Sequence, residues 1–243
     1  MKKQKPKGRW LRWLLITVVV LAGACALYLG DYYRADQAAL DAFQSAEAVE
    51  EHRLSDRAVA YLPEQPTAGL IFYPGGKVEH TAYVPLMEAC ARQGILCVLV
   101  EMPFRLAVLD LEAAQGLQAH FPEVERWYMA GHSLGGAMAG AYLEDHAGDF
   151  DGLVLLAAYS TTDLTQSGLR VLSVYGSEDG VMDRETYESS KQNLPDDTVE
   201  VVIDGGCHAG FGVYGPQKGD GTPTLTVEEQ IGLTARAVVD FVA

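Results

Sequence analysis

Hydrophobic residues form one long apolar run near the N-terminus and, after residue 57, short apolar blocks that alternate with amphipathic segments. The long run extends from Trp13 to Gly30, 18 residues without a charged side chain. Short apolar blocks predict strands, whereas apolar residues spaced three or four apart predict helices. The predicted strands cover residues 57–62, 69–73, 95–100, 126–130, 152–158, 169–175 and 198–203. The predicted helices cover residues 83–93, 109–120, 134–146 and 183–193, with a last helix near Thr226, where Thr226-Val227-Glu228-Glu229 offers a capping box.

This alternation predicts an α/β fold. The strand from Ile95 to Val100 is apolar at every position, as strands are when helices cover both faces of a parallel sheet. We therefore expect a mostly parallel central sheet with helices on both faces, in one domain over residues 57–243, with no internal repeat. In such sheets, functional groups collect in loops at the carboxyl ends of the strands.

The segment between the apolar run and this domain, residues 31–56, is predicted to be a helical linker. From Tyr32 to Leu54 it is rich in Ala, Glu and Gln, and its apolar residues recur at helical spacing. This pattern predicts an amphipathic helix that joins a membrane segment to the domain.

The N-terminal segment, residues 1–30, resembles either a signal peptide or a membrane anchor. Six Lys and Arg residues within Met1 to Arg12 precede the apolar run, which is near the lower length limit for a transmembrane helix. Small residues around Ala24 could form a cleavage site, and Cys25 a lipoprotein site, but the sequence stays apolar through Leu29. An uncleaved signal anchor is therefore favoured. The positive charges place the tail in the cytoplasm and the domain outside the cell membrane, which it would cross once.

The composition beyond residue 30 excludes some functions. Those residues hold 12 Lys and Arg against 33 Asp and Glu, a formal charge of −21, which repels nucleic acid and anionic lipid headgroups. Of the cysteines there, Cys90 and Cys97 lie in apolar runs and are expected to be buried thiols, although a disulfide between them stays open. No C-x-x-C pair, zinc pattern or dinucleotide-binding G-x-G-x-x-G turn is present, so we expect no metal and no cofactor.

The most informative motif is Gly131-His132-Ser133-Leu134-Gly135-Gly136, between a predicted strand and a predicted helix. A nucleophilic serine must project from such a sharp turn, and Gly131 and Gly135 leave room for strand and helix to approach. The amide of Leu134 would lie at the helix N-terminus, where it can donate to an oxyanion. The alternative is an ordinary strand-to-helix turn with a bystander serine.

Two further loops at carboxyl ends of strands supply the partners that such a serine needs. Asp179 follows the strand at 169–175, and His208 follows the strand at 198–203. His208 would act as general base and then general acid, and Asp179 would orient and stabilise its imidazole ring. Glu178 and Asp163 are the rival acids.

A fourth loop, Tyr73-Pro74-Gly75-Gly76-Lys77, follows the strand at 69–73. Its glycine pair lets backbone amides face a ligand, so we expect the amide of Gly76 to be the second oxyanion donor, with Lys77 near the pocket.

Together these loops make residues 57–242 resemble the α/β-hydrolase superfamily, most closely its compact, lidless, dienelactone-hydrolase-like members. Gly131 to Gly136 matches the nucleophile elbow, Gly176-Ser177-Glu178-Asp179 the acid loop, and Gly205-Gly206-Cys207-His208 the histidine loop. Pro74-Gly75-Gly76 stands where many members have His-Gly-Gly. Dienelactone hydrolases proper use a cysteine nucleophile, and here the elbow holds Ser133, so their lactone substrate is not carried over.

The pocket is expected to include Tyr83 and Phe211 as well as Lys77. Phe211 lies in the Gly-rich loop 209–221, which follows the base directly and is predicted to form a wall or to position His208. Tyr73 and Tyr159 could also rim the pocket. His132 is interpreted as structural, and His80 as near the site by chance.

The expected protein is a serine hydrolase of the α/β-hydrolase fold with an N-terminal transmembrane helix. Its substrate would be a small-molecule carboxylic ester or thioester with a small to medium acyl group, because no lid is present to shield a long chain. An amidase or peptidase, a perhydrolase, and a catalytically silent extracytoplasmic binding protein remain the alternatives.

Overall fold

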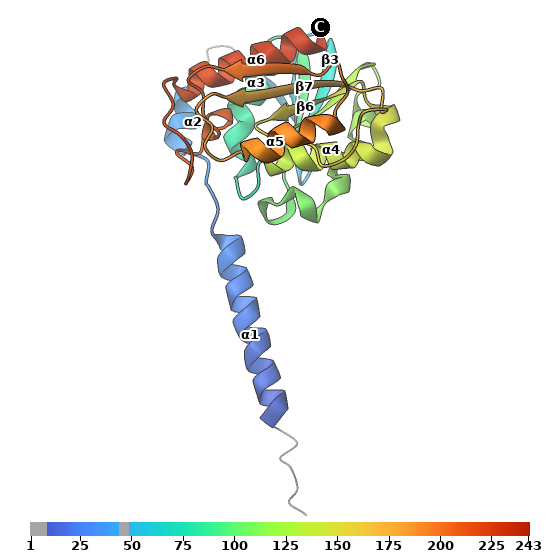
Figure 1. Ribbon diagram of the computed structural model, residues 1–243. Coiled ribbons are helices and arrows are strands. Elements are labelled where there is room, and N and C mark those ends of the chain that lie inside the picture. Colours follow the sequence, from blue (N-terminus) through green and yellow to red (C-terminus); the bar gives the residue numbers. More distant parts are fainter. Residues whose placement is uncertain (1–8, 44–48) are drawn as a thin grey trace, which may run out of the picture. The chain divides into compact units, whose positions relative to one another are not determined.

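A computed structural model of the 243-residue chain describes residues 9–43 and 49–243, and its contacts divide the chain into two units, Met1–Tyr32 and Tyr33–Ala243. The first unit is dominated by helix α1 (Arg9–Gly30; Figure 1). Within it, the stretch Trp10–Gly30 is the one helix among the described residues that is long and apolar enough to span a membrane. None of its most apolar window is buried, which distinguishes it from a core helix.

The second unit is built on one sheet of eight strands in the order β1-β2-β4-β3-β5-β6-β7-β8. The strands are β1 (Glu50–Ser55), β2 (Ala58–Leu62), β3 (Ala68–Tyr73), β4 (Ile95–Val100), β5 (Trp127–His132), β6 (Gly152–Leu156), β7 (Arg170–Gly176) and β8 (Val199–Ile203). Strands β4, β3, β5, β6, β7 and β8 are mutually parallel, and β1 and β2 join them as antiparallel neighbours. The predicted mostly parallel sheet is confirmed.

Helices cover both faces of this sheet, as predicted. The α-helices of the unit are α2 (Gln37–Phe43), α3 (Val84–Ala91), α4 (Leu134–His146), α5 (Arg184–Ser190) and α6 (Val227–Val242). Helices α3 and α6 lie on one face and α4 on the other (Figure 1). Because side chains alternate along a strand, Leu70 of β3 packs in the core under α3 and α6, whereas Ile71 packs in the core with α4. The capping box at Thr226 is present at the start of α6.

Short 3₁₀ turns connect these elements. They are His80–Tyr83, Pro103–Arg105, Ala107–Leu109, Leu111–Ala114, Leu117–His120, Ala147–Asp149, Lys191–Asn193 and Ala209–Phe211. The four cysteines are free thiols, with Cys90, Cys97 and Cys207 buried.

The predicted helix from Tyr32 to Leu54 is wrong from Glu50 onward. Helix α2 covers only Gln37–Phe43, residues 44–48 lie outside the described part of the chain, and Glu50–Ser55 is the edge strand β1. Strand β1 pairs antiparallel with β2, and nearly all its side chains are exposed. An edge strand without a buried face needs no alternating pattern, so its tertiary pairing, and not its local sequence, selects the extended conformation.

The predicted helix over residues 109–120 is also wrong. Three separate 3₁₀ turns occupy this region, and Gly116 interrupts it with a left-handed φ of 77°. The buried hydroxyl of Tyr73 donates to the carbonyl of Leu111 and accepts from the amide of Ala114. These bonds satisfy backbone groups that an α-helix would have paired internally.

Candidate active site

Ser133 occupies the turn between β5 and α4, with φ 52° and ψ −124°. A positive φ is strained for a residue with a side chain, and the turn is fixed by the Ser133 amide, which donates to the carbonyl of Leu156 on the neighbouring strand β6. Ser133 is the N-cap of α4, but its hydroxyl makes no capping hydrogen bond. The hydroxyl is therefore not used to cap the helix, and Ser133 lines the cavity described below.

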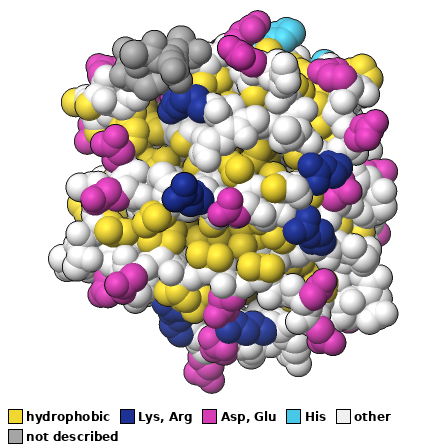
Figure 2. Space-filling model, turned by 90° about the horizontal axis from the view of Figure 1, so that it is seen from above, with side chains coloured by type: hydrophobic (Ala, Val, Ile, Leu, Met, Phe, Trp, Pro, Cys, Tyr) yellow, Lys and Arg dark blue, Asp and Glu magenta, His cyan; other side chains and the backbone are white. Residues whose placement is uncertain are grey.

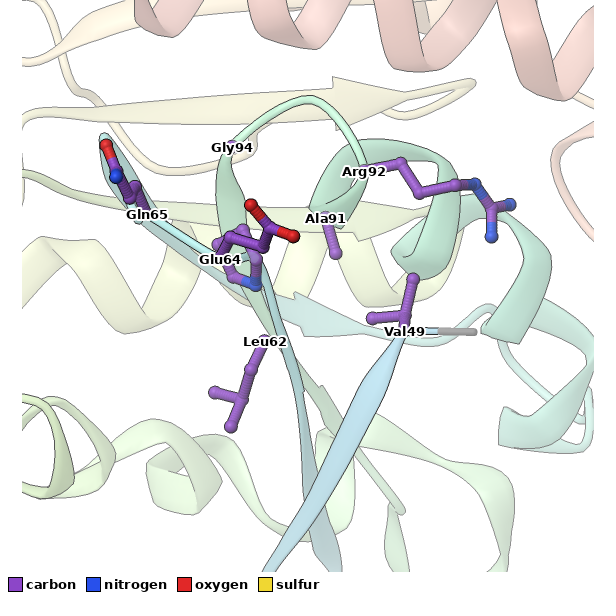
Figure 3. A pocket seen from close by; sticks show the side chains of 8 residues that line it. Val49, Leu62, Glu64, Gln65, Ala91, Arg92 and Gly94 are labelled. Atoms are coloured by element: carbon purple, nitrogen blue, oxygen red, sulfur yellow. The ribbon is translucent and has the colours of Figure 1, made fainter. Parts of the chain in front are cut away.

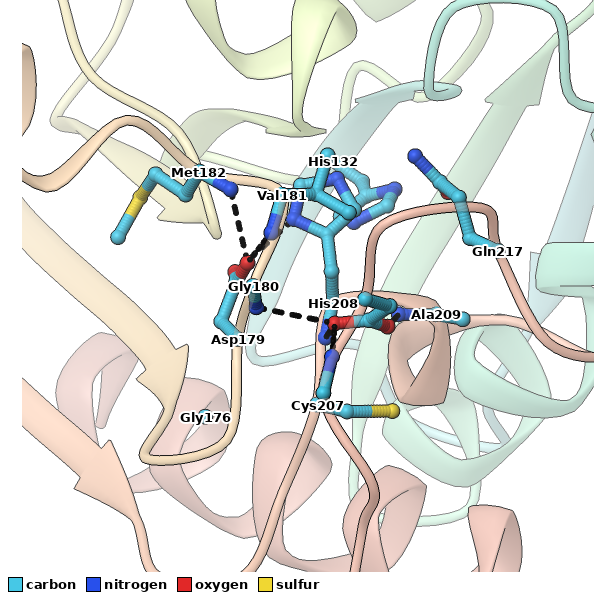
Figure 4. Close-up of polar contacts among 12 residues, drawn as sticks. His132, Gly176, Asp179, Gly180, Val181, Met182, Cys207, His208, Ala209 and Gln217 are labelled. Atoms are coloured by element: carbon cyan, nitrogen blue, oxygen red, sulfur yellow. Dashed lines mark hydrogen bonds and ion pairs between the residues drawn. The ribbon is translucent and has the colours of Figure 1, made fainter.

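Asp179 and His208 are brought together by the loops that follow β7 and β8. Nδ1 of His208 lies 2.9 Å from Oδ2 of Asp179, and both side chains are almost completely buried. The other carboxylate oxygen of Asp179 accepts from the amides of Val181 and Met182, at 2.9 and 2.8 Å (Figure 4). Burial raises the pKa of the Asp179 carboxyl, but His208 and the two amides lower it more, so the net pKa lies below the usual aspartate value. The ionised carboxylate of Asp179 is thus in position to orient the imidazole.

The rival acids lie away from this histidine. Glu178 is exposed, and its carboxylate accepts a hydrogen bond from the hydroxyl of Ser177. Asp163 is exposed as well, and its carboxylate accepts from the amide and hydroxyl of Thr165. The geometry therefore favours Asp179.

Asp220 holds the acid and base loops together, a role that sequence reasoning missed. Its carboxylate accepts from the amides of Gly180, His208, Ala209 and Gly221, at 2.8 to 3.2 Å. One side chain thereby fixes both the residue after Asp179 and the backbone of His208. The only signal in the sequence was a single aspartate between two glycines in the loop that follows the base.

Ser133 and His208 line the same cavity, of about 280 Å³. Its wall is formed by Ser133, Leu134, Ala137, Ala157, Ala158, Tyr159, Val181, Met182, Asp183 and His208. Nε2 of His208 is buried and has no hydrogen-bond partner among the described residues, so it is available to a group in this cavity. Among the residues that the structure describes, no hydrogen bond joins Ser133 to His208. Catalytic hydrogen bonds are often long in the absence of substrate and shorten when the substrate binds. Ala157 also has a positive φ, 45°, which sequence reasoning did not foresee.

The loop after β3 places Gly76 against Leu134. A Cβ added at Gly76 would lie 2.8 Å from Cδ2 of Leu134, so these two residues adjoin. The amide of Gly75 donates to the hydroxyl of Tyr83, and the amide of Lys77 donates to the carbonyl of Arg105. The amide of Leu134 belongs to the first turn of α4, where amides have no intrahelical acceptor. The arrangement suits Gly76 and Leu134 as paired donors to an oxyanion.

The predicted pocket residues lie elsewhere. Tyr83 and Phe211 are fully buried beneath the site, and neither they nor Lys77 line the cavity. The Tyr83 hydroxyl, which accepts from the Gly75 amide, lies 2.8 Å from Nδ1 of His132. The hydroxyl and this ring nitrogen form a hydrogen bond, and Phe211 packs on the His132 ring. Tyr159, expected as a possible rim residue, does line the cavity.

His132 is a neutral, buried histidine next to the base. Its ring centroid lies 4.6 Å from that of His208. Burial first, and then the charge of His208, hold the pKa of His132 well below the usual value, although an interaction with the His208 backbone opposes part of this shift. A neutral ring here adds no positive charge that would disfavour the imidazolium of His208.

A larger hollow, of about 500 Å³, lies at the opposite, amino end of the parallel strands. Val49, Leu62, Glu64, Gln65, Ala91, Arg92 and Gly94 line it with Pro63 (Figure 3). It holds no serine, histidine or cysteine, and the described residues contain no cluster of side chains that could hold a metal ion. The candidate serine and histidine instead line the smaller cavity, at Ser133.

Comparisons with known proteins agree with this fold. A family model described as the alpha/beta hydrolase family matches residues 69–232, more than half of the chain. No curated protein matches the chain.

Three similar solved structures cover most of the chain. TT1662 from Thermus thermophilus has a TM-score of 0.58 at 17% identity and covers 81% of this chain and 99% of its own. Est1E from Butyrivibrio proteoclasticus has a TM-score of 0.57 at 14% identity, with 80% and 97% covered. Dienelactone hydrolase from Anabaena variabilis has a TM-score of 0.55 at 14% identity, with 80% and 95% covered. At these identities the likeness establishes the fold.

Proposed function

Because the chain belongs to the alpha/beta hydrolase family, and is therefore a hydrolase, we propose that it cleaves a carboxylic ester or thioester through an acyl-enzyme on Ser133. The observation that carries this proposal is the arrangement around His208. Its Nδ1 is held by the buried carboxylate of Asp179, and its Nε2 is left available in the cavity that Ser133 also lines.

The reaction follows from the positions of these groups. Nε2 of His208 takes the proton of the Ser133 hydroxyl as Oγ attacks the carbonyl carbon, and the oxyanion that forms accepts from the amides of Leu134 and Gly76. The intermediate then expels the alcohol or thiol, which takes the proton from His208. A water molecule, deprotonated by His208, attacks the acyl-enzyme and releases the carboxylic acid and the free serine.

The size of the cavity supports a small to medium acyl group. Its volume is about 280 Å³, and Ala137, Ala157 and Ala158 contribute to its wall. Val181 and Met182 add apolar contacts from the acid loop, which suit an alkyl chain.

The first test is labelling with a fluorophosphonate probe, followed by hydrolysis of p-nitrophenyl esters of increasing chain length. Wild-type protein is expected to be labelled, whereas Ser133→Ala and His208→Ala are not. Ser189→Ala, an exposed serine on α5, serves as the matched control and keeps full labelling. A folded wild type that is not labelled contradicts the proposal and favours a silent binding protein.

We also propose that α1 remains attached as a single membrane-spanning anchor with the domain outside the cytoplasm. The support is the exposed apolar helix and the basic residues that precede its apolar run. Protease added to intact cells is expected to remove the domain. Digestion seen only after lysis would reverse the orientation.

A further inference from the structure

The segment that follows α1 is joined to the loop that carries the oxyanion donor. The amide of Tyr33 donates to the carbonyl of Lys77, and the amide of Glu79 donates to the carbonyl of Tyr33. The hydroxyl of Tyr33 accepts from the amide of Lys218, and its ring packs on Tyr214. Tyr33 is therefore fixed at the catalytic edge of the sheet, between the oxyanion loop and the loop that follows His208.

The distance along the chain between this point and the apolar helix is short. Only Asp31 and Tyr32 separate Gly30, the last residue of α1, from Tyr33. Three residue steps of fully extended chain reach at most about 11 Å. If α1 spans a membrane, the surface of that membrane cannot be far from the catalytic edge.

Exposed apolar side chains gather at the same place. We call Phe104, Val108 and Leu109 the apolar rim; their exposed fractions, 59, 58 and 54%, are the highest of the large apolar residues described after residue 33. The rim joins the oxyanion loop through Lys77, whose amide donates to the carbonyl of Arg105 while its carbonyl accepts from Tyr33. Scattered exposed apolar residues are ordinary, but three within six positions beside a catalytic loop are a surface feature.

The backbone of the rim is strained at the position of the exposed Phe104. Phe104 and Arg105 both have left-handed conformations, with φ of 51° and 61°, as does Lys77 at 60°. Each such residue costs about 1 kcal/mol or more, and strained backbone of this kind concentrates at functional sites. A turn that strains its backbone and leaves a phenylalanine in solvent gains nothing for the stability of the isolated domain.

We propose that the apolar rim docks on a lipid surface, and that the substrate is an amphiphilic ester held in that surface with its scissile bond at headgroup depth. This inference rests on the ester hydrolysis and the α1 anchor proposed above, and it names the substrate class. Lys77 bonds to Tyr33 through its carbonyl and to Arg105, the neighbour of Phe104, through its amide, so the start of the tether and the rim belong to one region of the domain surface. The ester then reaches the cavity at Ser133 from the bilayer. After hydrolysis, the product that carries the apolar chain, either the acid or the alcohol, returns to the bilayer.

The charge of the domain points to apolar insertion as the mode of contact. Residues after position 30 carry a formal charge of −21, so a general attraction to anionic headgroups is absent. The three rim side chains themselves carry no charge. We therefore expect docking to depend little on salt.

The test compares two esters that share an acyl group. Full-length protein in phosphatidylcholine vesicles is given ethyl butyrate, which dissolves in water, or hexadecyl butyrate, which stays in the bilayer, and released butyrate is measured for both. Rates are normalised to enzyme that reacts with a fluorophosphonate. The rim variant carries Phe104→Asn, Val108→Thr and Leu109→Gln, with asparagine chosen because it tolerates a left-handed backbone.

A matched control changes three exposed apolar residues away from the rim, on β8 and α6. Figure 2 shows the face on the α6 side, where apolar side chains lie among charged ones. The control carries Val199→Thr, Val202→Thr and Leu233→Gln, at positions that are 46 to 48% exposed.

We expect the rim variant to keep ethyl butyrate hydrolysis within about twofold and to lose about tenfold or more on hexadecyl butyrate, while the control keeps both. Equal retention of both activities in the rim variant, or a wild type that hydrolyses only ethyl butyrate, overturns the inference and leaves the proposed function intact. A wild type that cleaves neither ester and is not labelled contradicts the proposed function itself. If the triple variant does not fold, Phe104→Asn alone decides, with an expected loss of about threefold on the bilayer ester only.

Discussion

The two sides of Ser133 are held in place by different means. On the acid–base side, the carboxylates of Asp179 and Asp220 accept hydrogen bonds from six backbone amides in all, in addition to the bond between Asp179 and His208. On the oxyanion side, the buried hydroxyls of Tyr73 and Tyr83 bind backbone groups of the loops, and three residues there have left-handed backbone.

The difference matches what the proposed mechanism requires of each side. The acid–base side must hold an imidazole in one tautomer and one orientation, and charged acceptors that bind several amides give that rigidity. The oxyanion side must hold one or two amides while presenting a surface to the incoming substrate. The neutral hydroxyls of Tyr73 and Tyr83 hold the buried part of its loops, and the exposed part carries apolar side chains such as Phe104.

The largest expected effect concerns the orienting acid. Asp179→Asn should lower kcat by about 10⁴-fold, because an amide in place of the carboxylate favours the wrong tautomer of His208. Glu178→Gln and Asp163→Asn are the controls and should stay within about twofold. Steady-state kinetics on a p-nitrophenyl ester measure all three, and a larger loss from either control would move the acid role away from Asp179.

Two glycines test the close packing on the two sides. A Cβ at Gly135 would lie 2.2 Å from the carbonyl oxygen of Tyr73, and a Cβ at Gly176 would lie 2.2 Å from that of Gly206. Both contacts are with backbone, so Gly135→Ala and Gly176→Ala should each cost about 4 kcal/mol or more of unfolding free energy. Gly232→Ala, in the middle of α6 with nothing within 4 Å, should instead stabilise by about 0.5–1 kcal/mol. Denaturant titrations give the three values.

The carboxylate of Asp220 tests the rigidity of the acid–base side. Asp220→Asn replaces one acceptor oxygen by an amide that cannot accept from the backbone, so the base loop loses part of its anchorage. We expect kcat to fall about 10- to 100-fold with a small change in KM, as for a residue that positions a catalytic group. Asp204→Asn, an exposed aspartate just before the base loop, is the control. An unchanged rate of fluorophosphonate labelling in Asp220→Asn would show that the clamp does not position His208.

The hydroxyl of Tyr83 tests the oxyanion side in the same way. Tyr83→Phe leaves the buried amide of Gly75 without its acceptor and Nδ1 of His132 without its hydrogen-bond partner, which should cost about 1–3 kcal/mol of unfolding free energy. Tyr214→Phe removes a hydroxyl that bonds only the side chain of Gln217, and should cost about 1 kcal/mol or less. Equal losses of unfolding free energy in the two variants would mean that the bond between Gly75 and Tyr83 contributes no more to stability than a bond between two side chains.

The smallest effect is a difference in pH dependence between the two sides. The folded state holds the pKa of His132 well below its usual value, whereas the unfolded chain takes up a proton near pH 6.5. Stability should therefore fall as the pH drops below about 6.5, and His132→Gln should flatten that slope. Asp179 has a lowered folded pKa, so its contribution is present above about pH 4 and is lost only below it. Thermal melts between pH 8 and pH 3 separate the two windows.

Much of the fold could be predicted from the sequence because its strands are apolar on both faces. The parallel core strands, the Thr226 capping box and helices α3, α4 and α6 carry strong local patterns, and the structure confirms them. The polar edge strand β1 and the 3₁₀ turns after β4 have no such pattern. Strand β1 is extended because it pairs with β2. The turn at Leu111–Ala114 is held by hydrogen bonds to the hydroxyl of Tyr73, which lies 38 residues before Leu111.

The sequence by itself determined which residues could carry the chemistry, since Ser133, Asp179 and His208 each follow a strand and parallel strands bring their carboxyl ends to one edge. Only the tertiary structure decided which carboxylate faces His208, that Asp220 clamps the two loops, and that Tyr83 and Phe211 support the site from below. These outcomes depend on side-chain directions across loops that are far apart in sequence, and no local pattern encodes them. The attachment of Tyr33 beside Lys77 is of the same kind: it joins residues 44 positions apart through backbone hydrogen bonds, which any residue type could make.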